Sequence, residues 1–191
     1  MKGRESGMPE EAMWADFFDP PRILELLGLG TEIRDIVEFG CGYGTFTLPA
    51  ARMIQGTVHA LDIEAEMLEA TRIKAAAAGL KNVQLHQRDF IANGCGLAAE
   101  SIDYAMLFNI LHVENPVALL HEAKRILAPG GRAGIIHWNH DPATPRGPSM
   151  AIRPRPAQCI EWVLCSGLEL PKPSIIDLPP YHYGLVALRP S

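Results

Sequence analysis

Between residues 35 and 138 the chain alternates short apolar runs with longer stretches in which apolar and polar residues are mixed. The apolar runs have the length and the β-branched or aromatic content of buried strands, and we expect them at 35–39, 57–61, 82–86, 102–108 and 132–138. The mixed stretches have the length of helices, which we expect at 45–54, 64–78 and 116–127, with a short turn near 94–99. Strands and helices that alternate in this way are typical of an α/β protein with a parallel, doubly wound sheet.

Proline and glycine mark the ends of one of these helices. Pro116 suits the first turn of the helix 116–127, because its ring already has a helical φ and its missing N–H is not needed there. The Pro-Gly-Gly sequence at 129–131 is expected to separate this helix from the strand 132–138.

The last third of the chain is less regular, since ten of the sixteen prolines in the whole sequence lie between Pro142 and Pro190. Residues 156–167 read as a helix. Two short strands near 174–178 and 182–189 flank Pro179-Pro180-Tyr181, and a hairpin there would add an antiparallel pair to the sheet.

Before the first strand, residues 21–29 predict a helix, and the preceding segment carries Trp14, Phe17 and Phe18. These rings are expected either to cover a site or to pack under the helix. At roughly 150 residues per domain, a chain of 191 residues has room for one domain and little more. We therefore expect a cover segment at 1–20 and a single domain at 21–191.

Composition and charge narrow the class of protein. With 48% hydrophobic and 20% charged residues the chain can bury a large core, which excludes a disordered protein. Its net charge of −5, without any block of like charges, argues against a nucleic acid partner. Four cysteines without a CxxC pair, no signal-peptide pattern and no apolar run near ~18 residues predict a soluble, cytoplasmic protein without membrane spans. A homodimer stays a candidate assembly.

The sequence VEFGCGYGTF at 37–46 is the most informative motif, because it follows a predicted strand and opens a helix. Glycines at such a corner let the backbone turn sharply and approach a ligand. The dinucleotide fingerprint G-x-G-x-x-G would need a glycine where the chain has Thr45, and Glu38 opposes a phosphate but suits a cationic ligand. Asp62 ends the second predicted strand, where open α/β sheets bind the ribose of an adenosine ligand.

With these residues in place, the sequence resembles the class I S-adenosylmethionine-dependent methyltransferases, particularly the small single-domain bacterial type 11/25 group. The resemblance extends over residues 21–190 and implies a three-layer Rossmann-like sheet, S-adenosylmethionine (SAM) as cofactor and S-adenosylhomocysteine (SAH) as product. The matching segments are EFGCGYG (38–44), ALDIEAEML (60–68), QRDF (87–90), IDYAMLFNILHVENP (102–116) and EAKRILAPGGRAGI (122–135).

The resemblance also implies a role for each cofactor residue. Asp62 would accept both ribose hydroxyls, with a solvated turn carboxylate as the alternative. Asp89 would accept from the adenine amino group, with a helix cap as the alternative. Ile63 would pack on the adenine, Phe90 beside it, and Asn109 near the methionyl moiety. The backbone of Gly40, Cys41, Gly42 and Gly44 would cradle the amino acid end, with Glu38, which stands where Asp is more frequent, as an acceptor behind it.

Catalysis of methyl transfer requires in-line positioning, and a general base where the acceptor carries a proton. His112 and His140 follow the fourth and fifth strands and are our candidate bases; for His112 the alternative is packing against its own loop. His137 reads as a strand residue. No metal is expected, since His137, His140 and Asp141 lack a second group of ligands at a matching spacing.

The loop at 142–156 carries Arg146, Arg153 and Arg155 among five prolines and is a candidate lid. Its arginines could bind a carboxylate or phosphate, and the alternative is an ordinary solvated loop.

The acceptor is expected to be a small molecule. Nucleic acid amino-methyltransferases carry [DN]-PP-[YF] after the fourth strand, where this chain has residues 109–112, NILH. Asp19-Pro20-Pro21 and Pro179-Pro180-Tyr181 lie elsewhere. Two other readings stay open: a protein that binds SAM without catalysis, such as a sensor or an activating subunit, and a metalloid methyltransferase, which would need clustered cysteines where Cys159 and Cys165 lie six residues apart.

Overall fold

The computed structural model describes residues 10–171 and 175–191, and within them seven strands form one sheet in the order β3-β2-β1-β4-β5-β7-β6. β1 to β5 are parallel, while β7 runs antiparallel to β5 and β6 antiparallel to β7. The predicted α/β sheet with an antiparallel C-terminal hairpin is therefore confirmed. The strands are β1 (Ile36–Phe39), β2 (Val58–Asp62), β3 (Val83–Gln87), β4 (Ile102–Phe108), β5 (Leu127–Trp138), β6 (Ile176–Leu178) and β7 (His182–Leu188).

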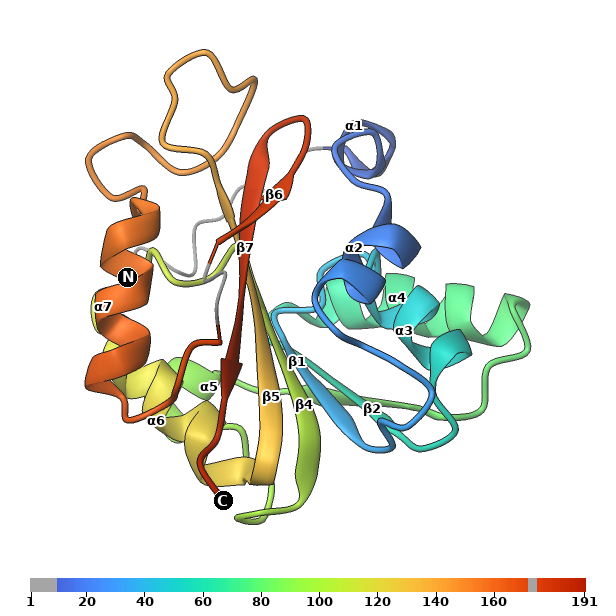
Figure 1. Ribbon diagram of the computed structural model, residues 1–191. Coiled ribbons are helices and arrows are strands. Elements are labelled where there is room, and N and C mark those ends of the chain that lie inside the picture. Colours follow the sequence, from blue (N-terminus) through green and yellow to red (C-terminus); the bar gives the residue numbers. More distant parts are fainter. Residues whose placement is uncertain (1–9, 172–174) are drawn as a thin grey trace.

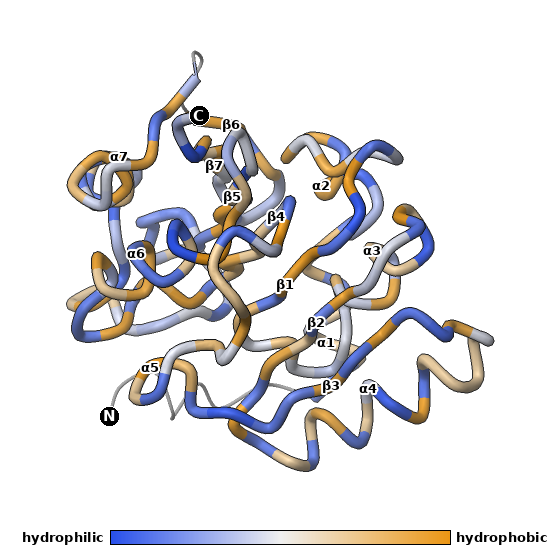
Figure 2. The backbone as a smooth tube through the Cα atoms, turned by 90° about the horizontal axis from the view of Figure 1, so that it is seen from below, coloured by the Kyte–Doolittle hydropathy of each residue, from blue (hydrophilic) through white to orange (hydrophobic). Residues whose placement is uncertain are grey.

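Helices cover both faces of the sheet and make three layers (Figures 1 and 2). One face carries α2, α3 and α4, with α1 at its upper end in Figure 1, and the other carries α5, α6 and α7. The helices are α1 (Glu11–Ala15), α2 (Pro20–Leu26), α3 (Thr47–Met53), α4 (Ala65–Ala77), α5 (Phe90–Asn93), α6 (Pro116–Ile126) and α7 (Pro156–Cys165).

The central strands are apolar on both faces, which is why their sequences read as continuous hydrophobic runs. Along β4, Ala105 and Leu107 join the core beneath α6 and α7, while Tyr104 and Met106 join the core beneath α2 and α3. All four side chains are fully buried.

Most predicted boundaries fall within a few residues of the observed ones, and local caps explain two of them. The side chain of Asn115 accepts a hydrogen bond from the N–H of Ala118 at 3.0 Å and caps α6, which begins at Pro116 as predicted. Asp19 accepts from Arg22 at 3.2 Å and begins α2. This helix ends at Leu26 rather than at residue 29, because Gly28 turns the chain with a φ of +78°. Residue 174, the predicted start of the first C-terminal strand, lies outside the described residues.

The predicted separator at 129–131 is wrong. β5 begins at Leu127, directly after α6, and its pairing with β4 shifts between Leu127 and Arg132. The reason lies in the chain that follows β7: the N–H of Gly130 donates to the carbonyl of Arg189 at 3.1 Å, and Arg189 donates back to Gly131 at 2.8 Å. The strand therefore continues through this segment as a bulge.

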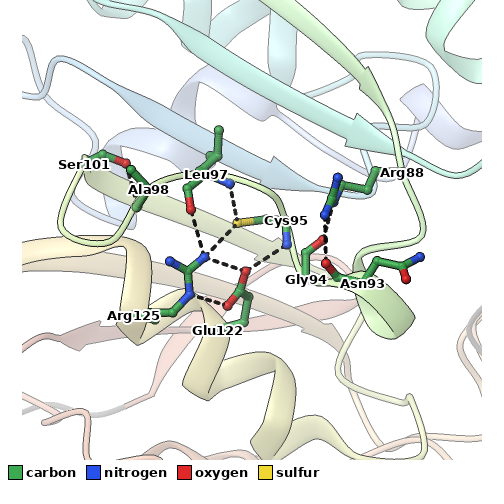
Figure 3. Close-up of polar contacts among 9 residues, drawn as sticks. All are labelled: Arg88, Asn93, Gly94, Cys95, Leu97, Ala98, Ser101, Glu122 and Arg125. Carbon is green, nitrogen blue, oxygen red and sulfur yellow. Dashed lines mark hydrogen bonds and ion pairs between the residues drawn. The ribbon is translucent and has the colours of Figure 1, made fainter.

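The turn expected near 94–99 is also placed incorrectly, since the helix between β3 and β4 is α5 at 90–93. The segment after it is held by side chains of α6 (Figure 3). Glu122 accepts from the backbone N–H of Cys95 at 2.8 Å and from Arg125 at 2.7 Å, and Arg125 also donates to the carbonyl of Leu97 at 2.9 Å. The side chains of α6 thus satisfy backbone groups of this segment that would otherwise be bonded within a helix.

We expect Glu122→Gln to lower the free energy of unfolding by about 1–3 kcal/mol, because the variant loses charge-assisted bonds to Arg125. The bond with Arg125 is the main reason that the pKa of Glu122 falls to about 2 from its ordinary 4.5. Its contribution is present above pH 4.5 and is lost as the pH falls towards 2. Urea unfolding at several pH values measures both effects.

The matched control for this prediction is Glu69→Gln, which removes an exposed pair with Arg72 on α4. It should change stability by less than about 1 kcal/mol. Equal losses in the two variants would contradict a structural role for Glu122.

Candidate functional site

A cavity of about 500 Å³ opens at the carboxyl ends of β1, β2 and β4. Strand order reverses between β1 and β4, and open α/β sheets bind their ligands at such a switch point. We call it the switch-point cavity. Of the ten predicted cofactor residues, nine line it: Glu38, Gly40, Cys41, Gly42, Asp62, Ile63, Asp89, Phe90 and Asn109.

Gly44, the tenth, does not line the cavity. Its φ is +78°, and a Cβ there would lie 2.9 Å from the hydroxyl of Thr71 on α4. Gly44 therefore allows the loop at 40–44, the glycine loop, to pack against α4. Sequence reasoning missed Thr71, which is fully buried and whose hydroxyl donates to the carbonyl of Gly42 at 2.9 Å; the sequence carries no signal for this contact.

Asp62 organises the glycine loop as well as facing the cavity. One carboxylate oxygen accepts from the N–H of Gly42 at 2.9 Å and the other from the N–H of Glu64 at 3.0 Å. The side chain is 8% exposed. Each carboxylate oxygen has two lone pairs, so both can accept a further bond from a ligand. The predicted ribose contact remains a proposal.

Glu38 is buried beneath the loop, 2% exposed. Burial raises its pKa to about 8, and the hydroxyl of Thr47, which donates to the carboxyl group, counteracts this only in part. At neutral pH this side chain is therefore mostly protonated in the absence of a ligand. A cation in the cavity would favour the carboxylate.

Asp89 and Phe90 lie on the side of the cavity next to β3. Asp89 caps α5 by accepting from the N–H of Ala92 at 3.1 Å, and it also lines the cavity, so the two alternatives weighed for it are not exclusive. Phe90 packs edge to face against Phe39, with 5.3 Å between ring centroids. Met67, which sequence reasoning missed, lines the same cavity as Ile63.

Asn109 has two properties that mark a binding residue. It directly follows β4 and has a φ of +55°, a conformation that is uncommon outside glycine and that asparagine adopts more readily than most residues. Both polar atoms of its amide are buried, and neither has a hydrogen-bond partner among the described residues. A buried amide without partners is costly, so a ligand that bonds to it gains affinity.

The structure separates the two candidate bases. His112 lines the switch-point cavity and also an adjoining cavity of about 580 Å³, which we call the side cavity, whereas His140 lines the side cavity but not the switch-point cavity. The Nδ1 atom of His112 is buried without a partner in the described structure, and burial lowers the pKa of the ring. His137 lies fully buried in β5, as expected of a strand residue, edge to face with His112 at 5.6 Å.

The loop at 142–156, the lid loop, lies over the switch-point cavity, which Arg146 to Ser149, Ala151 and Ile152 line. Arg153 is neither solvated nor free to bind an anion through two hydrogen bonds, because the residue is 7% exposed and its guanidinium binds the loop itself. It donates to the carbonyls of Asn139, Asp141, Arg146 and Pro148 at 2.9–3.1 Å and to the hydroxyl of Thr144. A proline-rich loop has carbonyls without regular partners, and the five donors of arginine satisfy them. Arg146 and Arg155 are exposed.

Residues 10–19, with α1, lie at the same end of the sheet as the lid loop (Figure 1). Trp14 of α1 lines the switch-point cavity, and its ring lies 6.4 Å from that of Trp138. Phe17 is buried and packs on Trp138 at 5.3 Å. The aromatic residues thus do both things expected of them: Trp14 covers the site and Phe17 joins the core.

Two further observations concern ligand types. Within residues 10–171 and 175–191, no three His, Cys, Asp or Glu side chains gather as metal ligands would. Cys159 is buried and Cys165 is exposed, so the two thiols do not face one space. In the same residues, no helix has the length and apolar character needed to span a bilayer.

The fold and the cavity together define a class of protein. A sheet in the order 3-2-1-4-5-7-6, with a glycine loop at its switch point and an acidic residue at the end of β2, is the architecture of a class I SAM-dependent methyltransferase. The family model described as a methyltransferase domain (Methyltransf_25) matches residues 36–131, half of the chain. The protein belongs to this family.

Particular relatives are similar to part of the chain. It is 32% identical over 133 residues to aklanonic acid methyltransferase DauC of Streptomyces sp. (strain C5), which covers 67% of this chain and 59% of DauC. It is 30% identical over 129 residues to nocamycin O-methyltransferase of Saccharothrix syringae, with 65% and 45% covered. The chain thus spans less than two thirds of the length of either relative. A SAM-dependent methyltransferase structure from Aquifex aeolicus shares the fold, with a TM-score of 0.83 over 94% of both chains at 22% identity.

Proposed function

We propose that this protein transfers a methyl group from SAM to an oxygen atom of a small organic acceptor. One observation carries the proposal: the switch-point cavity brings the glycine loop, Asp62 and the unpartnered amide of Asn109 together beside His112. Membership of the methyltransferase family supports it. The names of the two curated relatives, one of them an O-methyltransferase, support a small-molecule acceptor.

The residues of the cavity fit the cofactor part by part. When bound, SAM supplies an electrophilic methyl group on a sulfonium ion. Asp62 offers two acceptor oxygens for ribose hydroxyls, and Ile63 and Phe90 offer apolar surface for the adenine. The glycine loop presents backbone close to the ligand, and Asn109 supplies the polar contact for the methionyl end.

His112 is the proposed general base. Its lowered pKa keeps the imidazole neutral at physiological pH, and Nδ1 is buried while Nε2 is not, so Nε2 is the nitrogen available to an acceptor. His112 would accept the proton of the acceptor hydroxyl as its oxygen takes the methyl group that SAM supplies, which leaves SAH as the product.

The acceptor side of the cavity is aromatic. Trp14, Phe46, Phe108 and Trp138 line it, which favours a flat, apolar acceptor. A nucleic acid is not proposed, because the two Pro-Pro motifs have other positions: Asp19-Pro20-Pro21 begins α2, and Pro179-Pro180-Tyr181 forms the β6–β7 turn. We propose a cytoplasmic location on the basis of the four free cysteines.

The test combines binding and turnover. Calorimetry with SAH measures cofactor binding, and mass spectrometry of the purified protein identifies any retained acceptor. A panel of phenols, enols and carboxylic acids, assayed by SAH release, then measures turnover. Binding without turnover on any class would favour the non-catalytic alternative, and absence of SAH binding would refute the proposal.

We expect SAM binding at pH 7 to release close to one proton from Glu38. The pKa of about 8 leaves its carboxyl group mostly protonated, and a bound cation next to it favours the carboxylate. Calorimetry in buffers of different ionisation enthalpy counts the protons released. Glu38→Gln should abolish the release, while Glu25→Gln on the exposed face of α2 should retain it. Equal release in Glu38→Gln would assign the proton to another group.

A further inference from the structure

The side cavity has the position of an extension of the acceptor site. Its walls are the segment at 111–116 after β4, His140, the lid loop at 150–155, and the first two turns of α7 with Gln158 and Trp162. His112, Ala151 and Ile152 line both cavities. A molecule that reaches His112 from the side cavity therefore meets the proposed base at the boundary between the two.

The walls of the side cavity carry more positive than negative charge. Arg153 and Arg155 line it against a single carboxylate, that of Glu114. Within the described residues, no Asp or Glu oxygen lies within ion-pair distance of either guanidinium. Asp141 acts on the charge of Arg153 from a distance, and its side chain accepts from the N–H of Ala143 at 2.8 Å rather than from the guanidinium.

The two arginines differ in what they offer a ligand. Arg153 uses all its donors on the lid loop, so it contributes charge but no free N–H. The guanidinium bonds only to neutral acceptors, and Asp141 compensates its charge without a direct bond, so a further anion placed nearby would stabilise it. Arg155 is exposed, and its guanidinium has no bonded acceptor among the described residues, so its fork is available. Arginine in this state binds a carboxylate through two parallel hydrogen bonds.

We propose that the side cavity is a subsite for a carboxylate at the end of the acceptor remote from the methylated oxygen. Arg155 binds this carboxylate, Arg153 supplies further positive charge, and the half-buried Met150 and Trp162 pack on the apolar part between the two ends. The excess of one positive charge matches a single carboxylate better than a doubly charged phosphate. The inference rests on the proposed methyltransferase function and adds the substrate class.

Binding of a matched set of probes tests the subsite. The probes are 6-hydroxy-2-naphthoate, its neutral methyl ester and the corresponding 6-hydroxy-2-naphthyl phosphate, titrated by calorimetry with and without saturating SAH. We expect the wild type to bind the acid at least tenfold more tightly than the ester. Arg155→Gln should lose most of this preference and keep only the small part that the charge of Arg153 contributes, Arg155→Lys should keep more of it, and the control Arg22→Gln on α2 should keep all of it.

Each other outcome contradicts the proposal in a defined way. No binding of the acid, or equal binding of acid and ester by the wild type, overturns the subsite. An undiminished preference in Arg155→Gln overturns the role of Arg155, and tighter binding of the phosphate overturns the choice of a carboxylate. Methylation of the carboxyl group rather than the hydroxyl, read by mass spectrometry, overturns its remote position. Failure to bind SAH refutes the proposed function separately, because the acid and the ester are also compared without it.

Discussion

Asp62→Ala is expected to weaken SAM binding about ten- to a hundredfold. The variant removes the charge-assisted contact to the proposed ribose, worth roughly 1.5–3 kcal/mol in total. It also releases the N–H of Gly42, so the glycine loop loses one of the bonds that hold its shape. Calorimetry with SAM and with SAH measures the change in affinity.

A matched control distinguishes a binding defect from a general loss of structure. Asp103 accepts from the N–H groups of Arg34 and Asp35 at 3.0 Å each, before the amino end of β1 and far from the cavity. Asp103→Ala therefore removes two similar backbone bonds and should leave SAM affinity unchanged. Unchanged affinity in a folded Asp62→Ala would refute the assignment of Asp62.

His112→Gln is expected to lower kcat by about a hundred- to ten-thousandfold on an acceptor that carries a proton, the range for loss of a general base. SAM affinity should change little, since the ring faces the acceptor side. In the wild type, burial lowers the pKa of His112 below that of a free histidine. The imidazole is therefore neutral and can act as a base at neutral pH, and it becomes protonated only when the pH falls below this lowered pKa. Activity should thus fall on the acid side, and the variant should lack this limb of the profile.

Two other histidine variants complete this experiment. His121→Gln, on the exposed face of α6, should keep wild-type turnover. His140→Gln compares the two candidate bases directly: a large loss of kcat there, with little loss in His112→Gln, would move the base to the side cavity.

The arrangement of strands could be predicted from the sequence because buried parallel strands are continuous apolar runs. The strand at 102–108 has the predicted limits for this reason. The start of β5 could not be predicted in the same way, since Leu127 to Gly131 are extended through pairing with Arg189, which lies about sixty residues later. Glycine and proline in a sequence predict an interruption of regular structure, but they do not show whether a distant strand pairs with that segment.

The residues of the candidate site also fall into two groups: those that a local sequence pattern identifies and those that act through distant contacts. The glycine loop and Asp62 lie close in sequence and carry a recognisable spacing, so they could be identified. Thr71 and Thr47 could not, because each acts through a bond to a residue in another element. The internal role of Arg153 is a similar case: its acceptors are backbone carbonyls, which leave no trace in the identity of the loop residues.

The hydrogen bonds from Arg153 to the carbonyls of the lid loop affect how easily the acceptor preference of such a protein can change. The path of the lid loop is set by one guanidinium and a group of main-chain carbonyls, which are the same whatever side chains the loop carries. The residues that face the cavity from this loop can therefore be exchanged while its course is retained. Gly147 is an exception, because a Cβ there would lie 2.7 Å from Arg153 and 2.9 Å from Trp138. A new acceptor can thus be accommodated by changes in a few side chains, with the cofactor half of the molecule left intact.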